Sequence, residues 1–319
     1  MSGAGADAMA GAGRTAFTVG ANLPWVRYGG DVGANAWSPA GGFATRPTDR
    51  QRLDRLLVRL AGAGVTALRW FFLCDLRAGV RFDADGAAAG LQPEAWGDID
   101  AAVDCVGRAG LRLMPVLFDF HLCRPRRVVR GVELGGRSRL VAQPRLRASL
   151  LDAVVTPLLA RYGRAPEIAA WDLFNEPEWA TFGVGTWNPV ASVPRRAMRQ
   201  FLHDAAARVH EQTVHQVTVG SASVLTLDLV RGLGLDFYQP HWYDRFERRA
   251  PLARPVQELG CDRPVVLGEF PTRRSSRSPA ELIAAAEQNG YAGAYFWSAL
   301  AEDRYTHLDH ATASLADRI

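Results

Sequence analysis

The feature that most constrains the fold of this chain is a regular alternation of short apolar segments with longer amphipathic ones. Eight short runs rich in β-branched, aromatic and aliphatic residues recur along the 319 residues, at positions 17–23, 65–73, 111–120, 168–175, 216–222, 235–242, 264–270 and 292–300. Each run is almost continuously apolar, which is typical of strands in a parallel sheet that is covered on both faces.

The segments between these runs have the period of amphipathic helices. In residues 48–64 the leucines share one helix face, and two glycines then end the helix. Residues 93–110 and 278–290 have the same form, with a proline and an acidic residue in the first turn and a final glycine. Eight strands that alternate with helices predict an α/β fold, a closed (β/α)8 TIM barrel. An open doubly wound sheet is the alternative, but no glycine-rich phosphate-binding motif follows any of the runs.

The domain organisation and the partners follow from composition and from the absence of linkers. Residues 15–319 are expected to form one barrel domain, and the Gly/Ala-rich residues 1–14 a disordered N-terminal segment. All 37 basic residues are arginine and are spread along the chain, so the net charge of +4 is only weak support for nucleic-acid binding. We therefore expect no nucleic-acid partner. The chain has no signal-peptide pattern and no run of 18 apolar residues, so we expect a protein without a membrane partner that is cytoplasmic, or secreted if a leader was trimmed from the sequence.

Polar and aromatic side chains stand at the predicted C-terminal ends of several strands. In a (β/α)8 barrel these ends and the loops that follow them carry the chemistry. A buried strand that ends on a charged residue is costly unless the charge has partners, so the repetition of this pattern argues for a site. The residues are Arg69, Asp119, His121, Asn175, Glu176, His241, Tyr243, Glu269 and Trp297.

Two glutamates among these residues define a reaction class. Glu176 follows the fourth strand and Glu269 ends the seventh, so their side chains are expected to face each other across the barrel mouth. Cleavage of a glycosidic bond requires such a pair, in which one carboxyl group protonates the leaving oxygen and the other attacks the sugar or activates water. Either glutamate alone could instead form a structural salt bridge with an arginine.

Two motifs carry a resemblance to a known family. "WDLFNEPEW" (171–179) resembles the acid/base motif, Asn-Glu-Pro after strand four, of clan A glycoside hydrolases, and "VVLGEFPT" (265–272) resembles their nucleophile strand. Over residues 15–300 the chain is most similar to glycoside hydrolase family 5, the cellulase and mannanase group. It departs from the usual pattern at Pro271, where glycine is more common, and in the region 22–31 after the first strand. These departures leave the substrate open.

The resemblance implies a retaining hydrolase of β-glycosidic bonds with a carbohydrate substrate and no cofactor, and we expect it to act on oligosaccharides or small glycosides. Glu176 is then the proton donor and Glu269 the nucleophile, with their carboxyl groups ~5–5.5 Å apart. Asn175 would bind the sugar 2-hydroxyl, and Trp297 would form a platform under the sugar. The remaining expected substrate-site residues are Arg69 and Tyr243, which would orient Glu269, together with His121, His241, Trp179 and Trp242.

Several alternatives remain open at this point. The same chemistry would serve a transglycosylase, and a barrel that has lost activity would bind carbohydrate without cleaving it. A metal-dependent barrel hydrolase would need a His-x-His pair on the first strand, which has none, so no metal is expected. Arginine-rich loops at 123–139, 244–249 and 272–277 either bind an anionic substrate or carry solvated surface charge. The oligomeric state, and endo or exo action, are not predicted.

Overall fold

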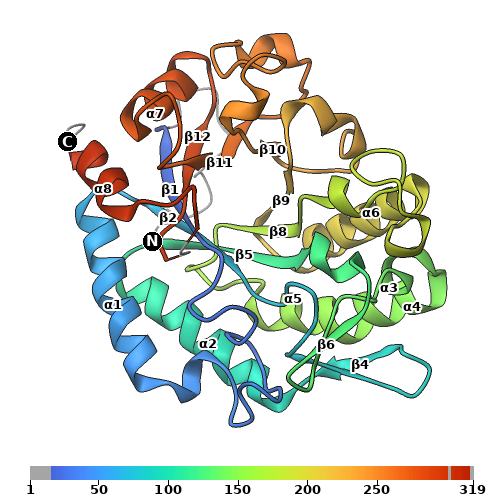
Figure 1. Cartoon of the computed structure of the whole chain (residues 1–319). Coiled ribbons are helices and arrows are strands. Elements are labelled where there is room, and N and C mark those ends of the chain that lie inside the picture. Colours follow the sequence, from blue (N-terminus) through green and yellow to red (C-terminus); the bar gives the residue numbers. More distant parts are fainter. Residues whose placement is uncertain (1–15, 301–302, 317–319) are drawn as a thin grey trace, which may run out of the picture.

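The computed structural model describes residues 16–300 and 303–316 (Figure 1). The segment 1–14, for which we expect disorder, therefore lies outside the described residues. None of the helices within these two ranges combines the length and the apolar character needed to cross a lipid bilayer.

A closed parallel barrel forms the centre of the molecule. Its strand order is β10-β9-β8-β5-β2-β1-β12-β11, and the two outer strands of this order are joined by the bridges Tyr238–Val265 and His241–Glu269. Each of the eight predicted runs overlaps one of these strands, so the predicted (β/α)8 barrel is confirmed. The strands are β1 (Thr18–Leu23), β2 (Ala67–Phe71), β5 (Arg112–Asp119), β8 (Ala170–Asn175), β9 (Gln216–Ser221), β10 (Gln239–Pro240), β11 (Val266–Pro271) and β12 (Gly293–Trp297).

Helices surround the barrel (Figure 1). They are α1 (Pro47–Gly62), α2 (Pro93–Arg108), α3 (Arg139–Ala142), α4 (Pro144–Leu150), α5 (Thr156–Tyr162), α6 (Arg195–Gln212), α7 (Pro279–Gln288) and α8 (Leu308–Ala316). The three helices predicted from periodicity are α1, α2 and α7, and α7 begins with a capping box between Ser278 and Glu281. A π-helical segment, Leu151–Val155, joins α4 to α5.

Short 3-10 helices replace α-helices in two crossovers of the barrel. Val224–Leu229 lies between β9 and β10, and Val256–Leu259 lies between β10 and β11. The strict alternation of strand and helix inferred from the sequence therefore fails in this part of the chain. The other 3-10 helices are Phe43–Thr45, Phe120–Cys123, Pro177–Ala180, Pro189–Ala191 and Asp244–Phe246.

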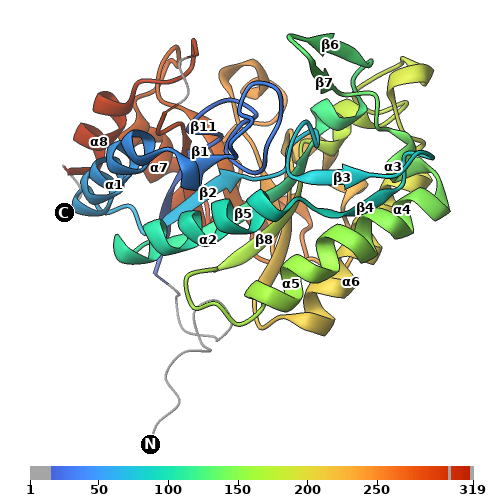
Figure 2. The same ribbon diagram turned by 90° about the horizontal axis from the view of Figure 1, so that it is seen from below.

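Two β-hairpins extend the loops after β2 and β5. The first pairs β3 (Val80–Phe82) with β4 (Ala88–Leu91), and the second pairs β6 (Arg127–Val129) with β7 (Val132–Leu134). The second hairpin projects away from the barrel (Figure 2). Arg130 and Gly131 form its turn, and both have positive φ angles (48° and 78°), as a two-residue type I′ turn requires.

Small residues make room for large ones inside the barrel. A core cluster separate from the main one consists of strand residues and Phe237, and it includes Tyr295 of β12. Gly20 of β1 lies opposite Tyr295 in the ladder, and a Cβ atom at Gly20 would come within 2.2 Å of the Tyr295 ring. The absence of a side chain at position 20 therefore allows the tyrosine ring to fill the barrel interior.

Gly20→Ala is expected to lower the free energy of unfolding by about 1–3 kcal/mol, because the added methyl group overpacks the ring of Tyr295. Urea denaturation monitored by circular dichroism measures this loss. Gly97→Ala is the matched control, because Gly97 lies in α2 and its added Cβ would meet nothing within 4 Å beyond the adjacent residues and the backbone of its own helix. The control should gain about 0.5–1 kcal/mol from helix propensity. Equal stabilities of the two variants would contradict this packing argument.

Candidate active site

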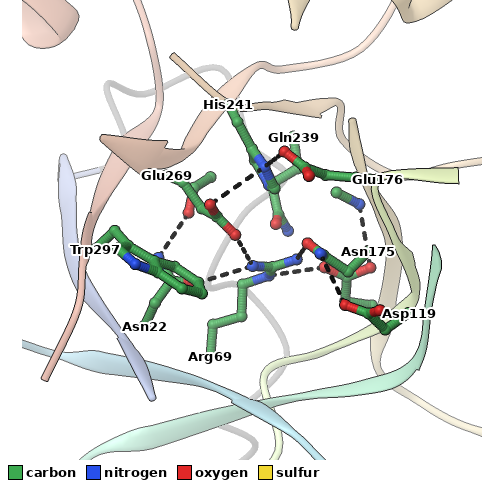
Figure 3. Close-up of polar contacts among 12 residues, drawn as sticks. Asn22, Arg69, Asp119, Asn175, Glu176, Gln239, His241, Glu269 and Trp297 are labelled. Carbon is green, nitrogen blue, oxygen red and sulfur yellow. Dashed lines mark hydrogen bonds and ion pairs between the residues drawn. The ribbon is translucent and has the colours of Figure 1, made fainter. Parts of the chain in front are cut away.

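The ends of β8, β10 and β11 bring two carboxyl groups and one imidazole together at the barrel mouth (Figure 3). One carboxylate oxygen each from Glu176 and Glu269 and one ring nitrogen of His241 lie within 4.8 Å of one another. The two glutamate side chains are largely buried, with 13% and 5% of their surface exposed. The structure therefore places the two glutamates face to face in a setting of low solvent access.

A single arginine connects four strands beneath these carboxyl groups. The guanidinium of Arg69 on β2 is fully buried, and its Nη1 donates to Glu269 Oε1 at 2.8 Å. Its other acceptors are Asp172 Oδ2 at 2.8 Å, Asn22 Oδ1 at 2.9 Å and Asn175 Oδ1 at 2.8 Å. Charge-assisted bonds of this kind compensate the cost of burying the guanidinium and fix the positions of its partners.

Glu269 accepts hydrogen bonds on both carboxylate oxygens. Oε1 is bonded to Arg69, and Oε2 accepts from the hydroxyl of Tyr243 at 2.8 Å. Burial raises the pKa of Glu269, while the charge of Arg69 and the hydrogen bond from Tyr243 oppose that rise. Burial and the nearby glutamates raise the pKa of Tyr243 far above its usual range, so the phenol stays protonated and donates a hydrogen bond to Glu269.

Glu176 is held in an uncommon backbone conformation next to its partners. Its φ and ψ angles are 49° and 55°, in the left-handed region, and its amide donates to the Gly220 carbonyl at 2.6 Å. Its carboxyl group accepts from Trp179 Nε1 at 2.9 Å and contacts His241 Nδ1 at 3.0 Å. Burial, with the charge of Asp119 as a second cause, raises the pKa of Glu176 to about 7.

His241 is a neutral hydrogen-bonding group between the two glutamates. Burial lowers the pKa of His241 to about 4, despite the nearby Glu269 charge, so its ring is uncharged at neutral pH. Nδ1 faces Glu176 at 3.0 Å and Glu269 at 3.5 Å, which favours a proton on that nitrogen. A Cβ atom at Gly220 would lie 3.0 Å from the other ring nitrogen and 2.5 Å from Arg69 Nη2. Glycine at position 220 therefore leaves the room that the histidine and arginine occupy.

The structure brings some of the other predicted residues into the site. Asn175 joins Arg69 to Asp119, since its Nδ2 donates to Asp119 Oδ2 at 3.3 Å. His121, partly exposed, hydrogen-bonds Asp119 through Nδ1. Burial by itself would lower the pKa of His121. The hydrogen bond to Asp119 and the negative charge of Asp119 have the larger effect together, so the pKa is raised. Trp297 is partly exposed, and its Nε1 donates to Asp303 Oδ2 at 2.6 Å.

The structure places Trp242, which is also predicted to contact substrate, among the residues outside the barrel strands. Its side chain is only 4% exposed and belongs to the hydrophobic core. The physical reason is the two-residue period of extended chain, because successive side chains point to opposite faces. His241 points into the barrel, so Trp242 points outward against the surrounding elements.

The arginine-rich loops form internal pairs at several positions. Arg126 is paired with Glu133 on the β6–β7 hairpin, and Arg277 is paired with Glu247 at 2.6 Å. Arg245 lies over the ring of Trp179, with its Cζ 5.8 Å from the ring centroid. These contacts account for part of the positive charge of the loops. They therefore support solvated surface charge more than the binding of an anionic substrate.

Several buried polar residues of the site were not identified from the sequence. Asn22 and Asp172 are acceptors for Arg69. Glu178 is buried as well, accepts from the Ala222 amide at 3.1 Å and from the Thr226 hydroxyl at 2.9 Å, and so ties the turn after Glu176 to the chain after β9. A polar residue within an otherwise apolar strand was the available signal for Asn22 and Asp172.

Glu176, His241 and Glu269 are also the one group within the described residues whose donor atoms lie close enough to hold a metal ion. The hydrogen bonds from Arg69 and Tyr243 already occupy both oxygens of Glu269. The contacts of the three side chains are therefore explained without a metal.

Arg69→Met is expected to lower the free energy of unfolding by about 3–5 kcal/mol, because the buried carboxylates of Asp172 and Glu269 lose their cation. Chemical denaturation at neutral pH measures the effect. The matched control is Arg126→Met, which removes an exposed ion pair worth no more than about 1 kcal/mol. Similar losses in the two variants would show that the Arg69 network does not hold the site together.

Comparisons with known proteins agree with this architecture. No protein-family model matches the chain. In sequence it is 23% identical over 329 residues to a mannan endo-1,4-β-mannosidase of Cryptopygus antarcticus, covering 89% of this chain and 81% of that protein. In structure it is similar to an endo-1,4-β-mannanase from Eisenia fetida, with a TM-score of 0.78, 21% identity and coverage of 96% and 91% of the two chains. It is also similar to a β-1,4-D-mannanase from Cryptopygus antarcticus, with a TM-score of 0.79, 20% identity and coverage of 96% and 90%. The resemblance to the cellulase and mannanase group is thus confirmed, at the level of sequence similarity and barrel fold.

Proposed function

We propose that this protein is a retaining glycoside hydrolase that cleaves β-1,4 bonds in mannan chains. The observation that carries the proposal is the proximity of Glu176 and Glu269, since one carboxylate oxygen of each lies within 4.8 Å of the other. Direct attack by one carboxylate requires a separation of ~5–5.5 Å, whereas a water molecule between the groups requires ~6.5–9.5 Å. The mannanase activity named for the similar proteins supports mannan as the substrate.

Glu269 is the nucleophile in this proposal. Its carboxylate attacks the anomeric carbon and forms a glycosyl ester, while the bond to the leaving oxygen breaks. Arg69 and Tyr243 hold the carboxylate through one hydrogen bond to each oxygen, so the attacking group is oriented before the substrate binds. The positive charge of Arg69 also favours the ionised form of Glu269.

Glu176 transfers the proton in both steps. In the first step it protonates the leaving oxygen, and in the second it takes a proton from the water that attacks the glycosyl ester and releases Glu269. A pKa of about 7, raised mainly by burial, keeps Glu176 protonated for the first step. Ester formation removes the negative charge of Glu269, and this change lowers the cost of ionising Glu176 for the second step.

Asn175 and Trp297 are proposed to bind the sugar at the point of cleavage. Asn175 donates one amide proton to Asp119, and its amide group has a second proton for the sugar 2-hydroxyl. That interaction strengthens as the transition state gains positive charge. The partly exposed ring of Trp297, fixed by its hydrogen bond to Asp303, offers an apolar surface to a face of the sugar.

Glu269→Ala is expected to abolish turnover of every substrate, because no other group can form the covalent intermediate. Glu176→Ala should lower kcat/KM on mannan by about 10²–10⁴-fold, but much less on an aryl β-mannoside whose leaving group needs little protonation. Initial rates on β-1,4-mannan and on dinitrophenyl β-mannoside measure the difference. Glu211→Ala, on the exposed end of α6, is the control and should keep wild-type rates. Equal losses on both substrates for Glu176→Ala would rule out its role as proton donor.

The pH dependence of kcat/KM on mannan is expected to fall as pH rises through about 7, because Glu176 must be protonated in the free enzyme. At lower pH the rate should fall again when Glu269 becomes protonated and can no longer attack. Rates measured from pH 4 to 10, with circular dichroism to verify folding, define both limbs. In Glu176→Ala acting on dinitrophenyl β-mannoside, the limb near 7 should disappear. Its persistence would assign that limb to another group.

A further inference from the structure

A cavity of about 630 Å³ lies against helix α6, which is on the outside of the barrel (Figure 1). Its volume falls within the range of small-molecule sites, ~300–1,000 Å³. The lining consists of side chains along α6 and of residues that follow the 3-10 helix Val224–Leu229. It includes Arg195, Arg196, Arg199, Gln200, His203 and Leu233. None of these residues belongs to the site of Glu176 and Glu269, so the reaction mechanism gives this cavity no role.

The lining of the cavity is strongly basic. Three of its residues are arginines and one is a histidine, and no acidic residue is among them. Arg195, Arg199 and His203 follow one another at intervals of four residues, so their side chains share one face of α6. Two arginine charges at this spacing repel each other and destabilise a helix. A bound anion would remove that cost.

Arg195 and Arg199 are held in place by backbone carbonyl groups. Nη2 of Arg195 donates to the Asp228 carbonyl at 3.0 Å. Arg199 donates to the carbonyls of Asp228, Leu229 and Arg231 at 3.1, 2.8 and 3.0 Å. Carbonyl groups orient a guanidinium but do not neutralise its charge. Since a guanidinium has five N–H groups, both arginines keep donors for a ligand.

Within residues 16–300 and 303–316, none of the three arginines of the cavity has a carboxylate partner. The carboxylates closest in the chain are paired with other groups. Asp228 is paired with Arg231 at 3.2 Å. Asp204 is paired with Arg147 at 3.5 Å and lies 3.6 Å from a ring nitrogen of His203. The cavity therefore has three guanidinium charges that no carboxylate neutralises.

The charge and the size of the cavity favour a phosphate group carried by a larger molecule. Arginine binds phosphate through two parallel hydrogen bonds, and a phosphate monoester has a charge of about −1.5 to −2 at neutral pH. A phosphate ion alone would fill only a small part of the cavity. The buried side chain of Leu233 offers an apolar contact to the rest of such a molecule.

The border of the cavity disfavours a long polyanion such as a nucleic acid. The side chain of Asp228, whose carbonyl group holds both arginines, is 81% exposed, and that of Asp204 is 29% exposed. A chain of phosphates that continued beyond the cavity would approach these carboxylates and be repelled. A single phosphate group among the three arginines would avoid them.

We propose that the cavity between α6 and Leu233 is a binding site for a small phosphate monoester, separate from the catalytic site. Arg195 and Arg199 bind the phosphate group through donors that are already oriented. Arg196 and His203 are exposed and supply further hydrogen bonds from the solvent side. The site is independent of the proposed hydrolysis, because none of its residues takes part in that reaction.

Isothermal titration calorimetry with phenyl phosphate tests the site. Arg196→Met should weaken binding about tenfold, because one charge-assisted hydrogen bond is lost. Arg195→Met/Arg196→Met should weaken it further, with circular dichroism to verify folding. Arg52→Met/Arg55→Met is the matched control, because it removes two exposed arginines of α1 outside the cavity, and it should bind like wild type. Phenyl phosphate should also raise the Tm of wild type more than the Tm of the cavity variant.

Absence of binding to wild type, in both titration heat and Tm, would overturn the site. Equal weakening in the cavity variant and in the control would do so as well, since it would mean general attraction between charges. Equal affinities for inorganic phosphate and phenyl phosphate would contradict the larger ligand. Tighter binding of a single-stranded oligonucleotide, lost in the cavity variant, would assign the cavity to a nucleic acid instead. Loss of phenyl phosphate binding in Glu269→Ala would place the ligand in the catalytic site.

Discussion

The buried guanidinium of Arg69 is the interaction on which the rest of the site depends. It donates to side chains from β1, β8 and β11 while standing on β2, so one cation joins strands that are far apart in the sequence. A buried cation is tolerated only when such bonds replace its lost hydration. The geometry of the hydrogen bonds from Arg69 is set by the closure of the barrel, which brings the ends of these strands together. Fold and site are therefore coupled, since the network requires the closed barrel and in turn fixes the orientation of Glu269 and Asn175.

The two glutamates differ in their surroundings, and this difference assigns their roles. Glu269 has a direct bond from Arg69, whereas Glu176 is bonded to the neutral Trp179 and His241. Burial raises the pKa of both carboxyl groups. Only Glu269 accepts a hydrogen bond from a cation, and that cation stabilises its charged form. One carboxyl group is thus suited to attack and the other to proton transfer, as in other pairs whose environments set their pKa values apart. The neutral His241 supports this difference because it bonds to both groups without adding charge.

Much of the fold and part of the site could be predicted from the sequence because both follow from strand periodicity. Eight apolar runs indicated the barrel, and polar residues at their ends indicated Glu176 and Glu269 as neighbours. Glu269 was expected as a partner of Arg69, but Asn22 and Asp172 could not be assigned, since their pairing with Arg69 depends on which strands meet across the closed barrel. Trp242 was predicted from its position at a strand end, but the alternation of side chains turns it into the hydrophobic core while His241 faces the site. The β6–β7 hairpin was missed because Arg130-Gly131 is not among the dipeptides that usually indicate a type I′ turn.

The most direct test of the central claim is the configuration of the sugar released first. Proton NMR during the hydrolysis of β-1,4-mannohexaose follows the anomeric signal before mutarotation mixes the two forms. Attack by Glu269 followed by attack of water inverts the anomeric carbon twice, so the account predicts that the first product has the β configuration. A first product of α configuration would mean a single displacement by water, and would contradict the role of Glu269 as a covalent nucleophile.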